Sequence, residues 1–460
     1  MNIFRKQNVK TYLGEDIKFS RTLSAFDLVA MGVGAVIGTG IFILPGTVAA
    51  TTAGPGVSLS FLIAAVICVL SGMCYAEFAS SIPVAGSAYS YGNIIYGEIT
   101  GWLMGWALIL EYMLAVATVA AGWSSYFTSF IKPFGVTIPK AFSGPFNPKG
   151  GVYFDLVAVV VIILISLLLA HGLKSSIKIN NLAVIIKISI ILIFIFVGLQ
   201  FIKPANYHPF LPYKFSGVFR GATTVFFAFL GFDVVSSSAA EVKKPQKNMQ
   251  IGIIGTLAVA VVLYMGVSLV LTGMVNYKDL NIANPVSFAL EYVHQNWVAE
   301  LLSLGAMIGM ATMMLTMIYS SSRLIYAMAR DGLLPHIFSK IDPKSKAPQL
   351  SLLAVTIIIA LGAAFFSVEQ LTNLVSFGTL FAFTLVSFGI LKLRKRTNIS
   401  NEGFKVPGYP IVPIISGLFC ILMMCQLNAD VYLLAAIWLV IGLIIYFAYG
   451  YKHSQLTNKD

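Results

Sequence analysis

Apolar runs long enough to cross a lipid bilayer recur along the chain from Phe26 to Tyr451. A helix needs about 20 predominantly apolar residues to cross the hydrocarbon core, and about twelve runs meet this length. Hydrophobic residues make up 58% of the chain and charged residues only 10%. Soluble proteins carry about 25% charged residues, so a water-facing surface of ordinary size could not be covered. The sequence therefore predicts an all-α integral membrane protein with about twelve transmembrane helices.

The apolar runs also predict the domain organisation. Their approximate positions are 26–51, 55–80, 97–125, 152–173, 177–202, 216–238, 251–276, 297–327, 348–367, 370–391, 408–427 and 430–451. We expect one transmembrane domain over residues 26–452, preceded by the segment 1–25 and followed by the tail 453–460.

The basic residues predict the orientation. They fall in short clusters between apolar runs, mostly on the side of the N-terminus, as in residues 392–396. Cytoplasmic connections of membrane proteins are enriched in Lys and Arg. We therefore expect both termini in the cytoplasm. The net charge of +12 is explained by these clusters, and nucleic acid is not an expected partner.

Four glycines interrupt the first apolar run, at Gly32, Gly34, Gly38 and Gly40. Each costs a continuous helix about 1 kcal/mol relative to alanine, and unwound backbone at membrane depth survives only where it is buried or lines a wet cavity. A break at Gly38-Thr39-Gly40 would free amide groups at the positive end of the second half-helix. Thr39 adds a hydroxyl donor. This arrangement suits a small carboxylate.

Two other interpretations of these glycines compete. Gly34 and Gly38 fit the small-xxx-small pattern of closely packed membrane helices, as do Gly305 and Gly309. A dinucleotide-binding loop requires a shorter glycine spacing and a surrounding βαβ unit, neither of which the sequence offers. Close packing therefore stays open as an alternative to a ligand site, whereas a nucleotide site does not.

A second break is expected in the sixth run, in the segment Phe226–Asp233. The first half of this helix should end near Gly231. Its last carbonyl groups would lack helical partners, at Phe227, Ala228 and Leu230. Carbonyls at the negative end of a helix suit an ammonium group. One break for a carboxylate and one for an ammonium describe a site for an α-amino acid.

The two breaks lie five runs apart, and five is odd. Two five-helix units would then be inserted with opposite topology, and corresponding broken helices in two such repeats mark the binding site of a secondary transporter. Phe229 and Phe232 would supply apolar walls or a gate. Packing against lipid or other helices is the alternative role for these rings.

Four ionisable residues lie within the apolar runs, where each is a candidate site residue: Glu77, Glu111, Lys187 and Asp233. Lys187 either extends its ammonium to the membrane surface or is an internal group that gains and loses a proton during transport. Glu111 could pair with Lys187, bond to a neighbouring helix or contact a cationic substrate. For Glu77 and Asp233 we favour structural or gating roles.

Nothing in the sequence indicates an enzyme. The histidines are scattered, and the four cysteines have no metal-ligand spacing. An integral-membrane transferase would need a cluster of His, Asp and Ser, or a metal site, at one membrane interface. We therefore expect no catalytic residues, no metal and no cofactor.

Over residues 20–452 the chain resembles the amino acid–polyamine–organocation superfamily of transporters. It is most similar to bacterial members of the cationic amino acid transporter subgroup. The segments that carry the resemblance are 34–42, 75–78, 83–89, 226–233, 241–245 and 323–335.

The resemblance implies a leucine-transporter-like fold, with two inverted five-helix repeats, broken spans 1 and 6 and two additional C-terminal spans. It implies that the substrate carboxylate binds at Thr39, Gly40 and Ile41, and the amine at Phe227, Ala228 and Leu230. Lys187 would stand where sodium-coupled relatives hold an ion, and Met317 would face the substrate side chain. The predicted substrate site also includes Ile37, Gly38 and Glu111.

These features predict a proton-coupled L-amino-acid permease of the cell membrane that works by alternating access. Its expected partners are the amino acid, the proton and the lipid bilayer. Met317 would shorten the pocket and favour small or branched neutral substrates. Glu111 keeps a cationic amino acid transporter open as an alternative, and an obligate amino acid exchanger is a further one.

Overall fold

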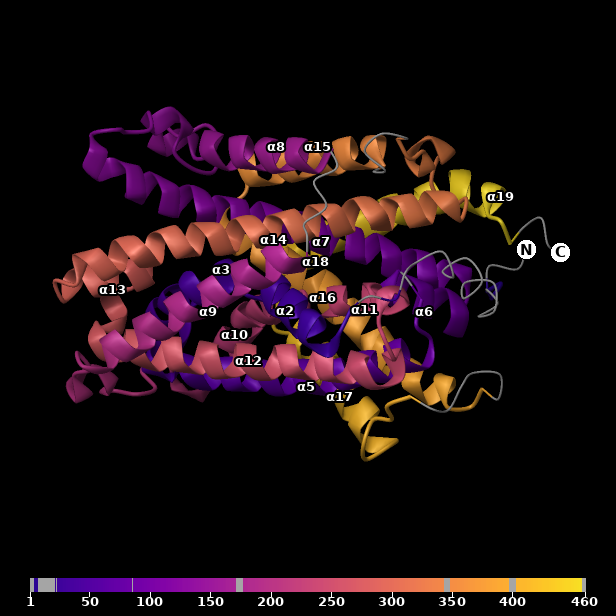
Figure 1. The fold of residues 1–460 in the computed structure, drawn as a ribbon, viewed down its shortest axis with the longest axis horizontal. Coiled ribbons are helices and arrows are strands. Elements are labelled where there is room, and N and C mark those ends of the chain that lie inside the picture. The colour runs from indigo at the N-terminus through magenta and orange to yellow at the C-terminus, as the bar shows by residue number, and fades with distance from the viewer. Residues whose placement is uncertain are drawn as a thin grey trace.

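The computed structural model describes residues 4–6, 21, 23–84, 86–170, 177–342, 348–396 and 403–456. Within these ranges the chain is helical, and strand pairing is limited to isolated bridges such as Leu23 with Val242. Most helices run along the long axis of the molecule (Figure 1). The α-helices are α2 (Ala25–Val36), α3 (Thr39–Phe42), α4 (Leu44–Val48), α5 (Val57–Ser81), α6 (Ser87–Ile95), α7 (Glu98–Ile131), α8 (Leu156–Ala170), α9 (Ile177–Leu199), α10 (Lys214–Val225), α11 (Phe232–Ser237), α12 (Pro245–Met274), α13 (Pro285–Tyr292), α14 (Asn296–Arg330), α15 (Gln349–Phe365), α16 (Val368–Leu393), α17 (Ile411–Met424), α18 (Ala429–Ile445) and α19 (Tyr451–His453).

Eight helical stretches in the described ranges are long and apolar enough to cross a membrane. Four shorter apolar helices, α2, α8, α15 and α17, coincide with four further predicted runs. The prediction of an all-helical protein with several membrane-spanning helices is therefore confirmed, while the count of twelve crossings stays a prediction.

The first predicted break is confirmed. A capping box between Ser24 and Asp27 starts α2, because the two side chains satisfy backbone groups that a helix start leaves free. The helix stops after Val36. Ile37 is extended, with ψ of 92°, and Gly38 has φ of −121° and ψ of −132°, so neither is helical. The chain then resumes helical geometry in α3.

The second predicted break is also present. After α10 the chain tightens into a 3₁₀ turn over Phe226–Phe229, and Leu230 is extended. Gly231 has φ of +106°, in the left-handed region that glycine adopts without a steric penalty. The helix α11 follows at once. Glycine is therefore required at this position by the backbone itself.

The broken helices lie at the centre of the bundle. The short helix α3 contacts α7, α12, α14 and the Phe226–Phe229 turn, and α2 packs against α9, α11, α12 and α14. The long helices α7 and α14 pack along each other, and α8 and α15 lie together at one edge (Figure 1). The breaks are thus enclosed by long helices.

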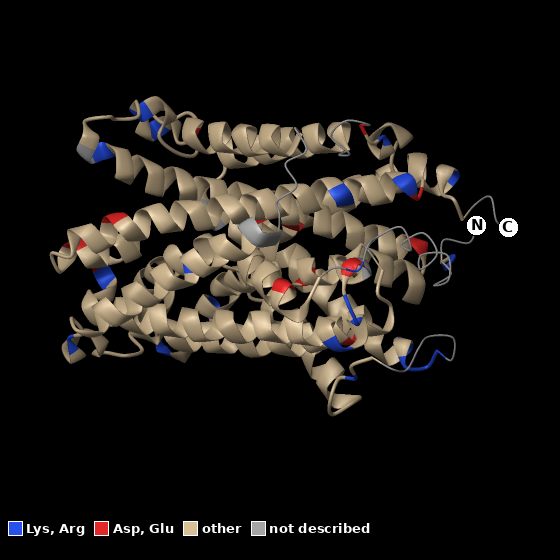
Figure 2. Ribbon diagram, in the orientation of Figure 1, with Lys and Arg blue, Asp and Glu red and all other residues tan. Residues whose placement is uncertain are grey.

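Lys, Arg, Asp and Glu positions are coloured mainly toward the two ends of the bundle, and fewer of them lie in its middle (Figure 2). Large apolar side chains are exposed on the outer helices, among them Leu164 at 55% and Leu361 at 54%. Exposed apolar surface of this kind suits contact with lipid. Arg5 and Ser454, which lie near opposite ends of the sequence, both bond to Glu98 at the start of α7.

Candidate functional site

The two breaks touch each other. A methyl group built on Gly40 would lie 2.6 Å from the Cα atom of Ala228, and one on Gly231 would lie 3.0 Å from the carbonyl oxygen of Ala35. Atoms do not approach so closely without displacing the backbone. The glycines therefore allow the first broken helix to cross directly over the second, which brings the predicted carboxylate and amine positions together.

Close packing of the first-run glycines is confirmed as well. A methyl group on Gly38 would lie 2.1 Å from the sulfur of Met313, and one on Gly34 would lie 3.1 Å from the side-chain oxygen of Asn180. The packing interpretation and the broken helix are therefore compatible, because the same glycines meet both requirements.

At the first break, α3 begins at Thr39. The amides of Thr39, Gly40 and Ile41 open this helix, where no earlier turn supplies a helical acceptor. The Thr39 hydroxyl is buried and has no hydrogen-bond partner among the described residues. Its methyl group fills the space beside Gly122 of α7, where an added Cβ would lie 2.2 Å away. The packed methyl group thus fixes the side chain while its donor stays unused.

At the second break, the expectation that three carbonyls lack helical partners is wrong for Phe227, and the Ala228 carbonyl, although it has no helical partner, is not free. The Phe227 carbonyl accepts a hydrogen bond from the Leu230 amide at 3.2 Å, because the 3₁₀ turn brings an amide three residues ahead into reach. The Ala228 carbonyl accepts from the Tyr264 hydroxyl at 2.6 Å. Tyr264 comes from α12, which the local sequence around the break could not reveal.

Lys187 lies inside the protein and does not extend to the membrane surface, so that interpretation is wrong. Its side chain is 1% exposed. Its Nζ atom donates to the carbonyl oxygens of Ile37 at 2.6 Å and Gly34 at 3.2 Å. Gly309 of α14 makes the space, since a Cβ there would lie 2.7 Å from the Lys187 Cε atom.

Glu111 does not pair with Lys187. Both of its carboxylate oxygens are buried without a hydrogen-bond partner among the described residues. The nearby Thr379 hydroxyl donates instead to the Val375 carbonyl at 3.1 Å. Thr379 of α16 thus lies close to Glu111, but neither carboxylate oxygen has a hydrogen-bond partner among the described residues.

Asp233 and Glu77 differ in how many of their carboxylate oxygens accept a hydrogen bond. Asp233 accepts a hydrogen bond from Tyr112 at 2.5 Å with one oxygen, and its other oxygen has no partner among the described residues. Glu77 accepts two hydrogen bonds from Arg394, at 2.7 and 2.8 Å, and one from the Val406 amide at 2.6 Å. The structural role favoured for Glu77 agrees with this saturated arrangement.

Met317 lies at the second break, and its role in facing the substrate stays a prediction. A methyl group on Gly231 would lie 3.0 Å from its Cε atom. Met313 covers Gly38 and was not among the predicted site residues. Met313 precedes Met317 by four residues on α14, and residues four apart share a helix face. That spacing could have identified it.

The predicted apolar walls are part of larger aromatic groups. Phe229 packs against Phe61 and Tyr264, with ring centroids 6.3 and 5.0 Å apart. Phe232 packs against Tyr75 and Phe383, at 5.7 and 5.0 Å. The non-glycine residues of the predicted site expose at most 3% of their surface. A ligand would therefore reach the breaks only after the surrounding helices move.

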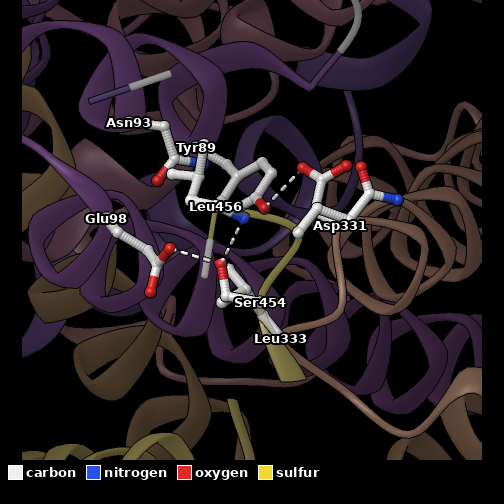
Figure 3. Close-up of a pocket in the computed structure, with 8 residues that line it drawn as sticks. Tyr89, Asn93, Glu98, Asp331, Leu333, Ser454 and Leu456 are labelled. Atoms are coloured by element: carbon white, nitrogen blue, oxygen red, sulfur yellow. Dashed lines mark hydrogen bonds between the residues drawn. The ribbon is translucent and has the colours of Figure 1, made fainter. Parts of the chain in front are cut away.

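A small pocket, distinct from the breaks, is lined by residues of α6, α7, the segment after α14 and the C-terminal tail (Figure 3). There Tyr89 donates to Asp331 at 2.7 Å and Ser454 donates to Glu98 (Figure 3). Arg5 forms an ion pair with Glu98 at 3.0 Å. These contacts join the N-terminal segment, α6, α7, the end of α14 and the C-terminal tail.

The chain matches known transporters over nearly its whole length. Residues 23–448 match the family model described as "Amino acid permease". A "Methylthioribose transporter" of Bacillus subtilis is 48% identical, with all of both chains covered. A "Branched-chain amino acid permease BcaP" of the same organism is 43% identical over 99% of both chains. The protein of that name in Lactococcus lactis is 38% identical, over 99% of this chain and all of its own length. The chain therefore belongs to the amino acid permease family, as its resemblance to the amino acid–polyamine–organocation superfamily implied.

Proposed function

We propose that this protein is a proton-coupled permease for neutral L-amino acids that works by alternating access in the cell membrane. The observation that carries the proposal is the direct contact of two helix breaks, one offering unused donors and the other carbonyl acceptors. We further propose twelve crossings in a leucine-transporter-like arrangement with both termini in the cytoplasm. Membership of the permease family supports this arrangement.

The carboxylate of the substrate binds at the first break. The amides of Thr39, Gly40 and Ile41 open α3, and the buried Thr39 hydroxyl adds a donor without a protein partner. The backbone of Ile37 and Gly38 is not helical, so the helix is interrupted directly before these donors. Donors that need no reorganisation bind an anion more strongly than flexible ones, because less ordering is required on binding.

The ammonium group of the substrate binds at the second break, on the carbonyls of Phe227, Ala228 and Leu230. Gly40 lies next to Ala228, so the carboxylate site and the amine site are close together. This supports a ligand whose carboxylate and ammonium groups are separated by no more than the backbone of one amino acid. The Phe227 and Ala228 carbonyls already accept one hydrogen bond each. A carbonyl oxygen has two lone pairs, and the Tyr264 donor can be released.

Lys187 couples transport to the proton. Its ammonium bonds to the carbonyls of Gly34 and Ile37, on the turn that leads into the carboxylate site. Loss of the proton removes the positive charge and weakens both hydrogen bonds, since charge-assisted hydrogen bonds are roughly twice as strong as neutral ones. Protonation thus stabilises the arrangement of the first break that this structure shows.

Neutral substrates are favoured over cationic ones. Met317 lies against Gly231 and leaves little room for a long side chain. Two relatives over 99% of the chain are named branched-chain amino acid permeases. An obligate exchanger uses the same site, and the absence of net uptake would identify it.

A methylthioribose transporter is the second candidate, because a relative with 48% identity carries that name. A ligand of that kind has neither a carboxylate nor an ammonium group, so it would use other partners. The unpartnered Glu111 oxygens would accept hydrogen bonds from its hydroxyl groups. The two candidates therefore differ in whether Glu111 or the helix breaks hold the ligand.

Uptake by purified protein in proteoliposomes tests these assignments. Labelled leucine, alanine, arginine and methylthioribose are offered with and without an inward proton gradient, in sodium and in choline buffer. We expect leucine or alanine to accumulate on the proton gradient in both buffers. Accumulation of methylthioribose or arginine alone would overturn the neutral amino acid assignment. Leucine uptake that requires sodium would overturn proton coupling, and counterflow without net uptake would identify an exchanger.

A further inference from the structure

The hydroxyl group of Tyr264 stands between the two helix breaks. Its oxygen lies 2.6 Å from the carbonyl oxygen of Ala228, at the second break, and 3.1 Å from that of Val36, the last residue of α2. A phenol carries one proton, so it donates to one of these carbonyls at a time. The shorter distance places the proton on the Ala228 side in this structure.

The ring of Tyr264 is fixed. Its centroid lies 5.4 Å from that of Phe61 and 5.0 Å from that of Phe229, and the side chain is fully buried. Close packing of this kind holds a side chain in one rotamer. The hydroxyl hydrogen can still rotate about the C–O bond, so the donor can change carbonyls while the ring stays in place.

Without the Tyr264 hydroxyl, the Val36 carbonyl would still have a hydrogen-bond donor, whereas the Ala228 carbonyl would depend on the substrate for one. The Val36 carbonyl also accepts a hydrogen bond from the Gly38 amide at 3.1 Å. The Ala228 carbonyl is among the groups assigned above to the substrate ammonium. A buried carbonyl without a donor is costly, so an empty amine site needs a substitute donor, and Tyr264 supplies it.

We propose that Tyr264 is a positioning residue that exchanges its hydrogen bond with the substrate ammonium. It donates to Ala228 while the amine site is empty and turns to Val36 when the ammonium occupies Ala228. Occupation of the second break thereby adds a hydrogen bond at the end of α2, the edge of the first break. This inference rests on the proposed amino acid site and deepens it.

The test is the affinity of the Tyr264→Phe variant for leucine, measured by isothermal titration on purified protein in nanodiscs. Without the hydroxyl, the Ala228 carbonyl lacks its donor in the empty protein, so the ammonium gains more on binding. We expect leucine to bind about threefold to tenfold more tightly, because the Val36 carbonyl already has the Gly38 amide as a donor, and the bond that Tyr264 gains there in the wild type offsets only part of the one it gives up at Ala228. A purely structural role predicts weaker binding, and equal or weaker binding overturns the inference.

Tyr126→Phe is the matched control. The Tyr126 hydroxyl is also buried and donates to a backbone carbonyl of the first broken helix, that of Phe42 at 3.1 Å, away from the second break. We expect its leucine affinity to stay within about twofold of the wild type, because no substrate carbonyl loses its donor. An equal gain in both variants contradicts the inference.

Two further comparisons complete the test. If Tyr264→Phe does not fold, 3-fluorotyrosine at position 264 keeps the hydroxyl, and its ¹⁹F resonance should shift on leucine binding; an unchanged resonance overturns the inference. Wild-type protein that binds no leucine contradicts the proposed leucine-binding function itself. Wild-type binding that Tyr264→Phe leaves unchanged contradicts only the role of Tyr264.

Discussion

The Nζ atom of Lys187 lies 2.6 Å from the carbonyl oxygen of Ile37, the residue at which the first broken helix stops. The same nitrogen reaches Gly34 one turn earlier, at 3.2 Å. The carbonyl end of a helix carries partial negative charge, so an ammonium stabilises the end of α2. Because Thr39 follows two residues later, the protonation of Lys187 and the shape of the carboxylate site are joined through a few backbone bonds.

The first prediction concerns Lys187→Ala. We expect this variant to lose leucine accumulation driven by an inward proton gradient, because no other described side chain donates to the Ile37 carbonyl. Uptake into proteoliposomes with an alkaline interior measures the effect. We expect accumulation to fall to the level of equilibration.

Two controls separate loss of coupling from loss of binding. Leucine counterflow at equal pH on both sides should persist in Lys187→Ala, since the donors at Thr39, Gly40 and Ile41 are unchanged. Lys392→Ala, at the end of α16 beside the Tyr96 ring, should accumulate leucine like the wild type. A Lys187→Ala variant that still concentrates leucine would show that Lys187 is not the coupling residue.

The second prediction compares two glycines of α14. Gly309→Val places a side chain where the Lys187 stem lies, because a Cβ at Gly309 would lie 2.7 Å from Lys187 Cε. Gly305→Val instead meets the apolar side chain of Ile190, at 2.0 Å from an added Cβ. Overpacking costs about 1–3 kcal/mol in either case, so both variants should melt at a lower temperature. Only Gly309→Val should also lose proton-driven accumulation, measured as for Lys187→Ala. Equal transport losses at matched melting temperatures would contradict a specific role for Gly309.

The sequence predicted both helix breaks because their cause is local. Glycines within an apolar run weaken the helix at that point wherever it packs, and Gly38 and Gly231 lie where the backbone leaves helical geometry. Thr39 and Met317 were predicted as site residues from their position relative to the breaks and from the family resemblance. Neither depended on knowing which helix lies opposite.

The contacts that the sequence could not predict come from other helices. Tyr264 reaches Ala228 from α12, and Met313 covers Gly38 from α14. Whether Lys187 extends to the membrane surface or inward depends on Gly309, which is more than one hundred residues away in the chain. Such partners are set by packing between helices, and the pattern of one helix does not reveal them.

The third prediction concerns Thr39→Val. Valine keeps the shape of threonine and its contact with Gly122, but removes the unpartnered hydroxyl. A hydrogen bond to a charged group contributes about 1.5–3 kcal/mol, so the KM for leucine should rise about tenfold or more. The melting temperature should not fall, because no protein hydrogen bond is lost. Thr39→Ser keeps the hydroxyl but not the packed methyl group, so its KM should stay closer to the wild-type value than that of Thr39→Val. An unchanged KM in Thr39→Val would remove Thr39 from the carboxylate site.

The fourth prediction concerns Met317→Ala. Shortening this side chain opens space beside Gly231, so larger side chains should be accepted. Each methylene that a pocket gains or loses changes selectivity about tenfold or more, and the ratio of arginine to leucine uptake should rise by at least about tenfold. Met328→Ala, a fully buried methionine against Gly105 on the same helix, should keep the wild-type ratio. Equal ratios in both variants would place Met317 outside the side-chain pocket.

The last prediction compares two ion pairs of different burial. Glu77 is 3% exposed and binds Arg394 and the Val406 amide, whereas the pair of Glu241 with Arg323 is 32% and 43% exposed. Breaking a buried pair leaves the remaining charge without compensation, at a cost of about 3–5 kcal/mol, while an exposed pair contributes about 0–1 kcal/mol. Glu77→Gln should therefore lower the melting temperature in detergent by many degrees, and Glu241→Gln should leave it nearly unchanged. Similar melting temperatures for the two variants would contradict a structural role for Glu77, because the Arg394 contact would then stabilise the folded protein no more than a surface pair does.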